Sequence, residues 1–183
     1  MSGLQSEQGL LRIVEVSADD RSMMEQIGIL RVRAWATEVP EIRGQSLWLD
    51  LADQHARHWA MIDDTKLVAS ARMSVHQCIT EVPDADDYEG VFTTIPPCPI
   101  ASLNRLVVAP EARGRGFSTQ LDRVRLDAAE QMGCRSVILS TSTNLRLKHF
   151  AALGFTIVGD RRQAPVESLG LRPRPGKVLI RFL

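Results

Sequence analysis

The sequence predicts one α/β domain, built on a mixed central sheet of about seven strands with about four flanking helices. Short β-branched runs alternate with longer segments whose apolar residues have helical spacing. Glycine and proline clusters separate these segments at short intervals. The chain has 183 residues, 44% hydrophobic and 24% charged, which suits a single domain with a substantial core. We therefore assign residues 1–183 to one domain and expect residues 1–9 to be a loose tail.

The N-terminal elements are expected to be a strand and two helices. Leu10 to Val16 is rich in apolar and β-branched residues, which favours a strand. Ser17 and Asp20 resemble a capping box, so a helix is expected to begin there and to stop before Pro40. A second, short helix is expected from Gln45 to about Ala56.

A hairpin and a long loop are expected next. His58 to Asp63 and Lys66 to His76 have the composition of two strands, and the residues between them suit a tight turn. Gln77 to Pro99 is polar, acidic and rich in proline, which predicts a loop. Loops of this length inside a compact domain are usually functional or mobile.

The central strand and helix are expected within Ile100 to Met132. Pro110 breaks the strand, and Gly133 is a suitable stop for the helix. The remaining expected elements are a buried strand, a short helix and two closing strands, at Ser136 to Thr141, Asn144 to Leu153, Phe155 to Val158 and Lys177 to Phe182.

The turn between the central strand and its helix has the features of an anion site. Gly114 and Gly116 let the backbone approach a ligand closely and adopt positive φ. The first N–H groups of the helix lack intrahelical partners, and Arg113 and Arg115 add positive charge. The third glycine of the dinucleotide motif GxGxxG is absent, and the sequence has no GxxxxGK[ST]. This turn therefore predicts a backbone site for a pyrophosphate group, but one that belongs to neither of these two nucleotide-binding classes.

Charge and cysteine content exclude several other classes. Lys+Arg and Asp+Glu both number 22, and a formal charge of zero argues against a dedicated nucleic-acid binder. No apolar run approaches the roughly 20 residues that span a bilayer, and the N-terminus lacks the pattern of a signal peptide. The three cysteines fit neither a disulfide framework nor a metal site, which indicates a cytoplasmic protein without a metal.

Two segments resemble the GCN5-related N-acetyltransferase (GNAT) superfamily. The first is similar to the acyl-CoA motif of the family and comprises Leu106, Val108, Pro110, Arg113, Gly116 and Ser118, followed by the long helix. The second comprises Asn144 and the run HFAALGF from His149 to Phe155. The resemblance implies the GNAT fold, in which the fourth and fifth strands splay apart. It also implies transfer of an acyl group, most often acetyl from acetyl-CoA, to an amine.

The resemblance implies a role for each part of the motif. The N–H groups from Arg113 to Thr119 would hold the pyrophosphate of coenzyme A, and the strand at Leu106 to Val108 would bind the pantetheine arm. The N–H of Val108 would polarise the thioester carbonyl. Coenzyme contacts are thus expected at Leu106, Val107, Val108, Arg113, Gly114, Arg115, Gly116, Phe117, Ser118, Thr119, Asn144 and Phe150.

The catalytic acid and base depart from the family pattern. Phe150 occupies the position of the tyrosine that commonly protonates the leaving thiolate, so Ser142, Thr143 or water is the expected donor. The central strand carries no glutamate that could act as the base, and Glu41 is the leading candidate because it lies in the expected acceptor-binding loop. The other candidates for the base are Glu38 and His76. The expected catalytic residues are Val108, Glu41 and Ser142.

Two other functions stay open. A fainter similarity to acyl-homoserine-lactone synthases and N-acyl amino acid synthases of the same fold implies a long-chain acyl donor. It depends on Leu30 to Glu38, Asp50, Asp53, Val68 to His76 and the pair Asn104–Arg105. The phenylalanine at position 150 favours instead a catalytically silent acyl-CoA-binding module. The implied partners are an acyl-CoA, an amine acceptor and, as is common for this fold, a second copy of the chain.

Overall fold

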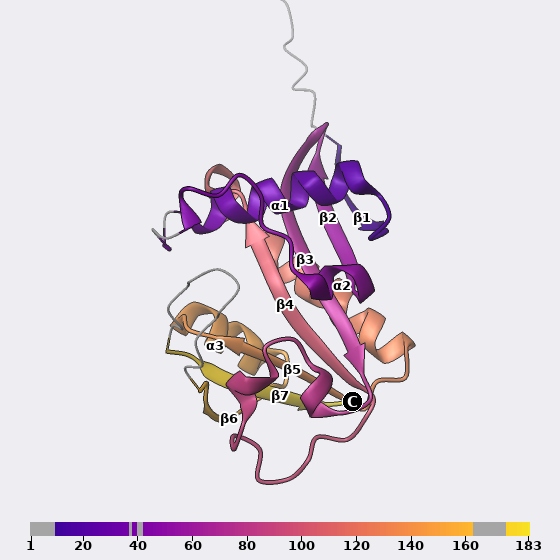
Figure 1. The fold of residues 1–183 in the computed structure, drawn as a ribbon, viewed down its shortest axis with the longest axis vertical. Helices are drawn as coiled ribbons and strands as arrows, with labels where there is room; N and C mark the ends of the chain where they lie inside the picture. The colour runs from indigo at the N-terminus through magenta and orange to yellow at the C-terminus, as the bar shows by residue number, and fades with distance from the viewer. Residues whose placement is uncertain (1–9, 37, 40–41, 163–174) are drawn as a thin grey trace, which may run out of the picture.

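One seven-stranded sheet forms the centre of the molecule (Figure 1). The computed structural model describes residues 10–36, 38–39, 42–162 and 175–183. The strand order is β1-β2-β3-β4-β5-β7-β6, and among the described strands only the β4–β5 pair is parallel. The strands are β1 Leu11–Val16, β2 Arg57–Asp63, β3 Lys66–His76, β4 Ile100–Val108, β5 Ser136–Thr141, β6 Thr156–Asp160 and β7 Lys177–Phe182. The predicted mixed sheet is confirmed.

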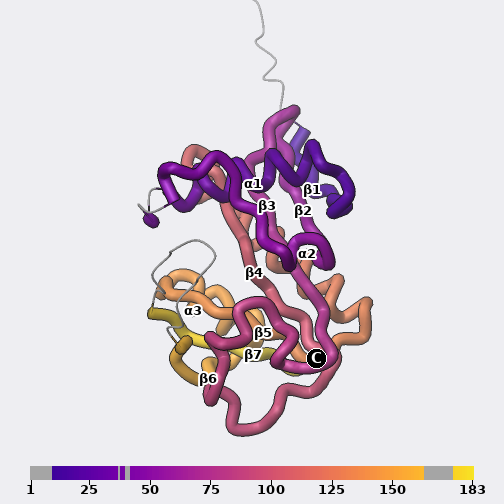
Figure 2. Tube along the Cα trace, in the orientation of Figure 1, coloured from indigo at the N-terminus to yellow at the C-terminus, as the bar shows by residue number. Residues whose placement is uncertain are grey.

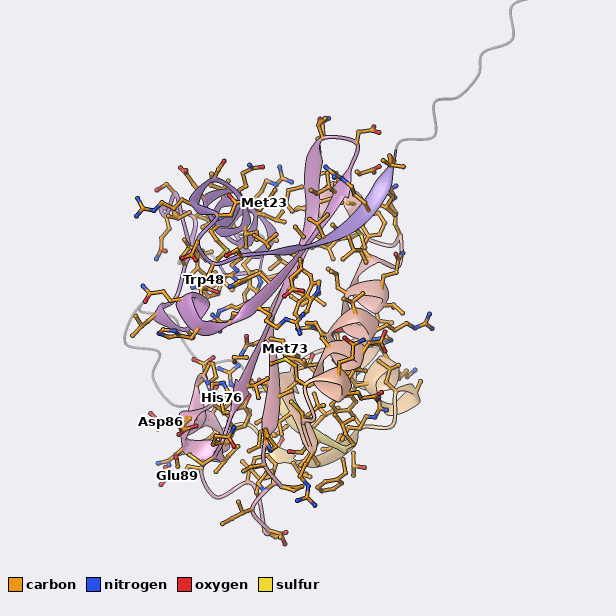
Figure 3. All side chains as sticks on the ribbon, turned by 90° about the vertical axis from the view of Figure 1, so that its right-hand side faces the viewer. Met23, Trp48, Met73, His76, Asp86 and Glu89 are labelled. Atoms are coloured by element: carbon orange, nitrogen blue, oxygen red, sulfur yellow. The ribbon has the colours of Figure 1, made fainter. Side chains whose placement is uncertain are left out.

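Helices cover both faces of this sheet (Figures 1 and 3). The α-helices are α1 Arg21–Trp35, α2 Phe117–Gln131 and α3 Asn144–Ala152. Helix α1 lies on one face of the N-terminal strands, and α2 and α3 lie on the opposite side. The described residues therefore contain three α-helices rather than the predicted four. Residues 1–9, predicted to be a loose tail, lie outside the described residues.

The predicted capping box at the start of α1 is wrong in its details. Asp20, rather than Ser17, caps the helix by accepting a hydrogen bond from the N–H of Met23 at 3.0 Å. The Ser17 hydroxyl accepts from the N–H of Asp19 instead, at 3.2 Å. An aspartate is as good a cap as a serine, so the helix simply begins one turn later than predicted.

The predicted helix from Gln45 to Ala56 is also wrong. Only Leu51–His55 is helical, as a 3₁₀ turn. The Asp53 side chain accepts a hydrogen bond from the N–H of Asp50 at 2.6 Å, and both carboxylates bind buried arginines. These side-chain bonds compete with a regular helix for the backbone of this segment.

Strands β4 and β5 separate along their length, as expected (Figure 2). They pair only from Ile100 to Ser102, opposite Ser136 to Ile138. Beyond that point Arg105 adopts φ 51°, and the register between β3 and β4 shifts. Such a bulge bends a strand. Strand β4 therefore leaves β5 and follows β3, which opens a space between the two parallel strands.

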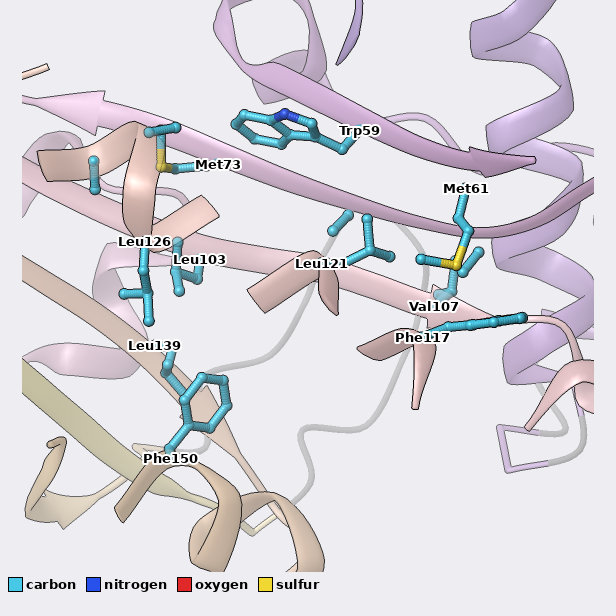
Figure 4. Packing of buried hydrophobic residues seen from close by; sticks show 14 of the residues in the cluster. Trp59, Met61, Met73, Leu103, Val107, Phe117, Leu121, Leu126, Leu139 and Phe150 are labelled. Carbon is cyan, nitrogen blue, oxygen red and sulfur yellow. The ribbon is translucent and has the colours of Figure 1, made fainter. Parts of the chain in front are cut away.

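The main core fixes α2 against the sheet (Figure 4). Phe117, Leu121 and Leu126 of α2 are buried together with Leu103 of β4 and Met73 of β3. Apolar residues from α3 and β5 extend the same core. Because Phe117 is the first residue of α2, its burial holds the start of the helix at the edge of the space between β4 and β5.

The segment between β3 and β4, predicted to be a loop, contains two 3₁₀ turns at Ile79–Glu81 and Ala85–Tyr88. Val82 and Tyr88 are buried against Ile138 of β5 and its neighbours in β4 and β7. Ile138 and Leu139 lie in different clusters because successive side chains of a strand point to opposite faces. This segment therefore packs on the face of the sheet that α2 and α3 leave uncovered.

Candidate active site

A cavity of about 530 Å³ lies where β4 and β5 separate. Its walls come from both strands, the C-terminal end of α1, the starts of α2 and α3, and the turn that carries Tyr88. The cavity has two chemically different ends. We name these ends by the roles that the family resemblance implies: the starts of α2 and α3 form the coenzyme end, and Arg105, Trp48, Asp84 and Tyr88 form the acceptor end.

The start of α2 presents unpaired backbone donors at the coenzyme end. Gly116 is the N-cap with φ 78°, and no described side chain caps the helix. By contrast, Asp20 caps α1 and Thr143 caps α3. In the described part of the chain, the N–H groups of residues 114–119 donate no hydrogen bond. Free donors and the helix dipole together make a site for a phosphate group.

The two arginines of this turn brace it through contacts with the protein. Arg113 donates to the carbonyl of Ala34 at 2.8 Å and lies 3.7 Å from the Glu38 carboxylate. Arg115 pairs with Asp63 at 2.7 Å and stacks on the ring of Phe117, 4.6 Å from its centroid. The anion site is therefore formed by backbone rather than by these guanidinium groups. Arg115 and Thr119 lie outside the lining of the cavity as far as the described residues define it.

The exposed edge of β4 faces the coenzyme end. The N–H of Ala109 donates to the carbonyl of Val68 in β3. Successive N–H groups of a strand point to opposite sides, so the N–H groups of Leu106 and Val108 point away from β3. Because β5 pairs with β4 only as far as Ser102, these donors open on the cavity. Their direction suits the role that the family resemblance implies for Val108.

The residues after β5 are divided between the cavity and the surface. Ser142 and Thr143 line the cavity, whereas Asn144 is exposed and absent from its described lining. Phe150 is 2% exposed and forms part of the wall, with its ring 5.1 Å from that of Phe155. The structure thus brings Ser142 and Phe150 to the cavity and leaves Asn144 outside it.

Of the three candidates for the base, Glu38 lines the cavity. Glu41 lies outside the described residues. His76 is absent from the described lining and makes a hydrogen bond with Ser74 Oγ at 2.8 Å. Burial lowers the pKa of His76, so its imidazole is mainly neutral near pH 7.

Tyr88 is a cavity residue that the sequence did not single out. It is buried at the acceptor end, and its hydroxyl interacts with Ser140 of β5. Burial and the nearby Asp84 raise the pKa of Tyr88 well above its ordinary value, so this hydroxyl is a donor and not a base. Its position depends on the folding of a loop, for which periodicity gives no signal.

A buried ionic cluster supports the coenzyme end. Asp122 of α2 is fully buried and contacts Arg125, Arg146 Nη1 at 2.7 Å and His149 Nε2 at 2.9 Å. Burial alone would raise the pKa of Asp122, but Arg125 and Arg146 lower it, so the carboxylate is charged. Arg125 and Arg146 line the cavity, and Arg146 stacks on Phe150 with 4.5 Å to the ring centroid. The cluster therefore holds the wall of the coenzyme end in place.

A second buried cluster supports the acceptor end. Arg31 binds Asp53 through two hydrogen bonds of 2.7 and 2.9 Å. Arg72 binds Asp53 at 2.9 Å and Asp50 at 3.0 Å, and Arg105 Nε donates to Asp50 at 2.5 Å. Despite burial, these guanidinium groups lower the pKa of both carboxylates. The charged residues of α1, β3 and β4 are thereby joined in one network.

Comparison with known proteins identifies the class. The sequence model of the Acetyltransferase (GNAT) family matches residues 24–155, which is more than half of the chain. The chain therefore belongs to the GNAT acetyltransferase family and is an acyltransferase. No curated protein matches the chain in sequence. The family resemblance predicted from the two motifs is confirmed.

Solved structures share the fold at low sequence identity. The ribosomal-protein-S18-alanine N-acetyltransferase from Escherichia coli is 14% identical, with 93% of this chain and 92% of that chain covered and a TM-score of 0.62. The Drosophila melanogaster polyamine N-acetyltransferase is 14% identical, with 95% and 100% covered and a TM-score of 0.65. A Bacillus subtilis acetyltransferase in complex with CoA is 12% identical, with 95% and 99% covered and a TM-score of 0.59.

Two further observations concern metals and membranes. In the described ranges, no three histidine, cysteine or carboxylate side chains are grouped so that they could hold a metal ion. None of the helices described in the structure combines the length and the apolarity that crossing a bilayer requires.

Proposed function

We propose that this chain transfers an acetyl group from acetyl-CoA to an amine by direct attack in a ternary complex. The observation that carries the proposal is the uncapped start of α2, whose unpaired N–H groups open on the cavity between β4 and β5. Family membership supports an acyl-CoA donor. The proposal implies the cytoplasm as the compartment, where the free thiols of the chain stay reduced.

Each group of residues has a distinct task in this proposal. The N–H groups of residues 114–119 bind the phosphates, and those of Leu106 and Val108 bind the pantetheine arm and the acyl oxygen. Acetyl-CoA supplies the thioester, whose acyl carbon is attacked and whose thiolate leaves. The N–H of Val108 stabilises negative charge on the acyl oxygen as the carbon–nitrogen bond forms and the carbon–sulfur bond breaks. Most of the rate enhancement then comes from positioning and from this donor.

The proton transfers are assigned to the residues that the family resemblance suggested. We assign removal of the ammonium proton to Glu41, with Glu38 as the alternative. Ser142, or water beside it, donates a proton or a hydrogen bond to the departing thiolate. A strong acid is unnecessary there, because an ordinary thiol has a pKa near about 8.5. The buried ring of Phe150 serves as a wall and takes no part in proton transfer.

Two experiments test the proposal. Thiol release is measured over a panel of amines with acetyl-CoA and, separately, with a long-chain acyl-CoA. The proposal predicts release with acetyl-CoA that depends on the amine. A preference for the long-chain donor would favour the alternative related to acyl-homoserine-lactone synthases. Saturable coenzyme binding without release on any amine would instead favour a silent binding module.

A further inference from the structure

Arg105 is held rigidly at the acceptor end of the cavity. Its Nε donates to Asp50 at 2.5 Å, and its guanidinium stacks on Trp48 with 4.8 Å to the ring centroid. The side chain is 17% exposed and lines the cavity. Its backbone has φ 51° at the bulge of β4, which turns this residue out of the regular alternation of the strand. One edge of the guanidinium is therefore fixed, and the other is available.

Among the described residues, the outer edge of this guanidinium has no hydrogen-bond acceptor. In the part of the chain that the structure describes, neither Nη atom of Arg105 makes a hydrogen bond. Asp84 Oδ2 lies 3.8 Å from Nη1, beyond hydrogen-bond distance. Two parallel N–H groups in a fixed plane are the donor arrangement that binds a carboxylate in a bidentate way.

The cluster behind Arg105 has more hydrogen-bond donors than acceptors. Its three guanidinium groups, from Arg31, Arg72 and Arg105, bind the carboxylates of Asp50 and Asp53. Arg31 Nε and Arg72 Nη2 are buried and have no partner among the described residues. The two inner carboxylates are therefore fully engaged, and they leave the outer edge of Arg105 to another acceptor.

Arg161 and Glu38, two other charged side chains that line the cavity, have ionic partners within the protein. Arg161 contacts Asp87 at 2.5 Å, and Glu38 lies 3.7 Å from Arg113. His58, beneath the cluster, is mainly neutral because burial lowers its pKa. Asp84 is the carboxylate that the described residues place near Arg105 Nη1, and its side chain is partly exposed.

We propose that Arg105 binds a carboxylate of the acceptor, so that the acceptor is an amine of the α-amino acid type. This inference depends on the proposed transfer to an amine at the same cavity. Arg105 directly precedes Leu106 to Val108, the segment assigned to the acyl group. In an α-amino acid only one carbon separates the carboxylate from the amino group, and Arg105 and the segment from Leu106 to Val108 line the same cavity. Trp48 and Tyr88 provide the apolar walls for the rest of the acceptor.

The test compares acceptors that differ only in the carboxylate. Initial rates are measured for a panel of α-amino acids, their amides and their decarboxylated amines, with acetyl-CoA held at saturation. The inference predicts that the amino acids have values of kcat/KM at least about 10-fold above those of both analogues, since hydrogen bonds to a charged group are worth about that factor or more. Equal values for the three forms of each acceptor would overturn the inference but leave the transferase proposal intact.

Variants at Arg105 provide the second arm. Arg105→Gln is expected to raise the KM for an α-amino acid about 10- to 100-fold and to change the KM for its amide less than about 2-fold. Arg105→Lys keeps the charge but lacks the planar fork, so an intermediate KM is expected. Arg57→Gln removes a guanidinium that pairs with Glu15 away from the cavity, and it is the matched control. An Arg105→Gln enzyme with an unchanged amino acid preference would contradict the inference.

A binding measurement separates this inference from the proposed function. Thermal stabilisation by α-amino acids and by their amides is measured with coenzyme A present. Carboxylate-dependent stabilisation that disappears in Arg105→Gln supports the anion site even if no acetyl transfer occurs. Transfer to amines without any dependence on Arg105 supports the transferase alone.

Discussion

The two ends of the cavity are equipped to bind charge in different ways, although strand β4 serves both. At the coenzyme end the donors are backbone N–H groups at the uncapped start of α2. At the acceptor end the donor is the guanidinium of Arg105. Backbone donors are placed by the helix itself, whereas a side-chain donor needs other residues to hold it. The acceptor end therefore depends far more than the coenzyme end on residues behind its surface.

Each end nevertheless has a buried carboxylate that organises its arginines. Asp122 lies behind Arg125 and Arg146 at the coenzyme end. At the acceptor end Asp53 lies behind Arg31 and Arg72. It is connected to Arg105 through Asp50, which hydrogen-bonds to both residues. Removing these carboxylates one at a time shows whether the two ends are independent.

The largest effect on stability is expected for Asp53→Asn. This change leaves two fully buried guanidinium groups without their charged partner, which costs about 3–5 kcal/mol in the free energy of unfolding. Urea unfolding of the native chain and the variant measures this loss of stability. Glu15→Gln, which removes the partner of Arg57 in a half-exposed pair, is the control and is expected to cost about 1 kcal/mol or less. Similar losses in the two variants would contradict the role given to Asp53.

A smaller effect is expected for Asp122→Asn. Two of its three partners, Arg146 and His149, are partly exposed and can be solvated after the change. The free energy of unfolding, measured again by urea unfolding, is therefore expected to fall by about 2–3 kcal/mol. The kinetic effects should also differ. Asp122→Asn should raise mainly the KM for acetyl-CoA, and Asp53→Asn mainly the KM for the acceptor. If both variants raised the same KM, the division of the cavity into two ends would be wrong.

The smallest effect concerns pH and His58. Burial lowers the pKa of His58 below that of the unfolded chain, so below about pH 6.5 the unfolded state binds more protons than the folded state. The free energy of unfolding should then fall between pH 7 and pH 5, by at most about 1.4 kcal/mol per pH unit for this group. His58→Gln can still donate to the Asp53 carbonyl and should make the slope shallower. An unchanged slope in this variant would show that other groups cause it.

The coenzyme end could be predicted from the sequence because its parts are adjacent in the chain. A strand, two glycines and a helix start within about 15 residues define a backbone site, and local pattern is sufficient for that. The acceptor end could not be predicted as a site. Its network joins Arg31, Asp53, Arg72 and Arg105, which come from four separate segments. In the sequence these residues form only a pattern similar to that of a related family, and their pairing follows from the tertiary structure.

The same reason explains the errors in secondary structure. Asp50 and Asp53 have the spacing of a helix, but their ion pairs hold the segment from Gln45 to Ala56 in an irregular path with one 3₁₀ turn. Tyr88 lies in a polar segment whose two 3₁₀ turns carry it into the cavity. In both cases long-range contacts override local propensity.

The most direct test of the central claim is the affinity for acetyl-CoA, measured by titration calorimetry, of the native chain and of Gly116→Asp. An aspartate at this N-cap accepts the hydrogen bonds of the open N–H groups and repels phosphate. Gly90→Asp is the matched control, because Gly90 has φ 71°, close to the 78° of Gly116, and lies away from the cavity. The account predicts a loss of about 100-fold or more for Gly116→Asp, equivalent to about 2.7 kcal/mol, and native affinity for Gly90→Asp. Native affinity in Gly116→Asp would contradict the account.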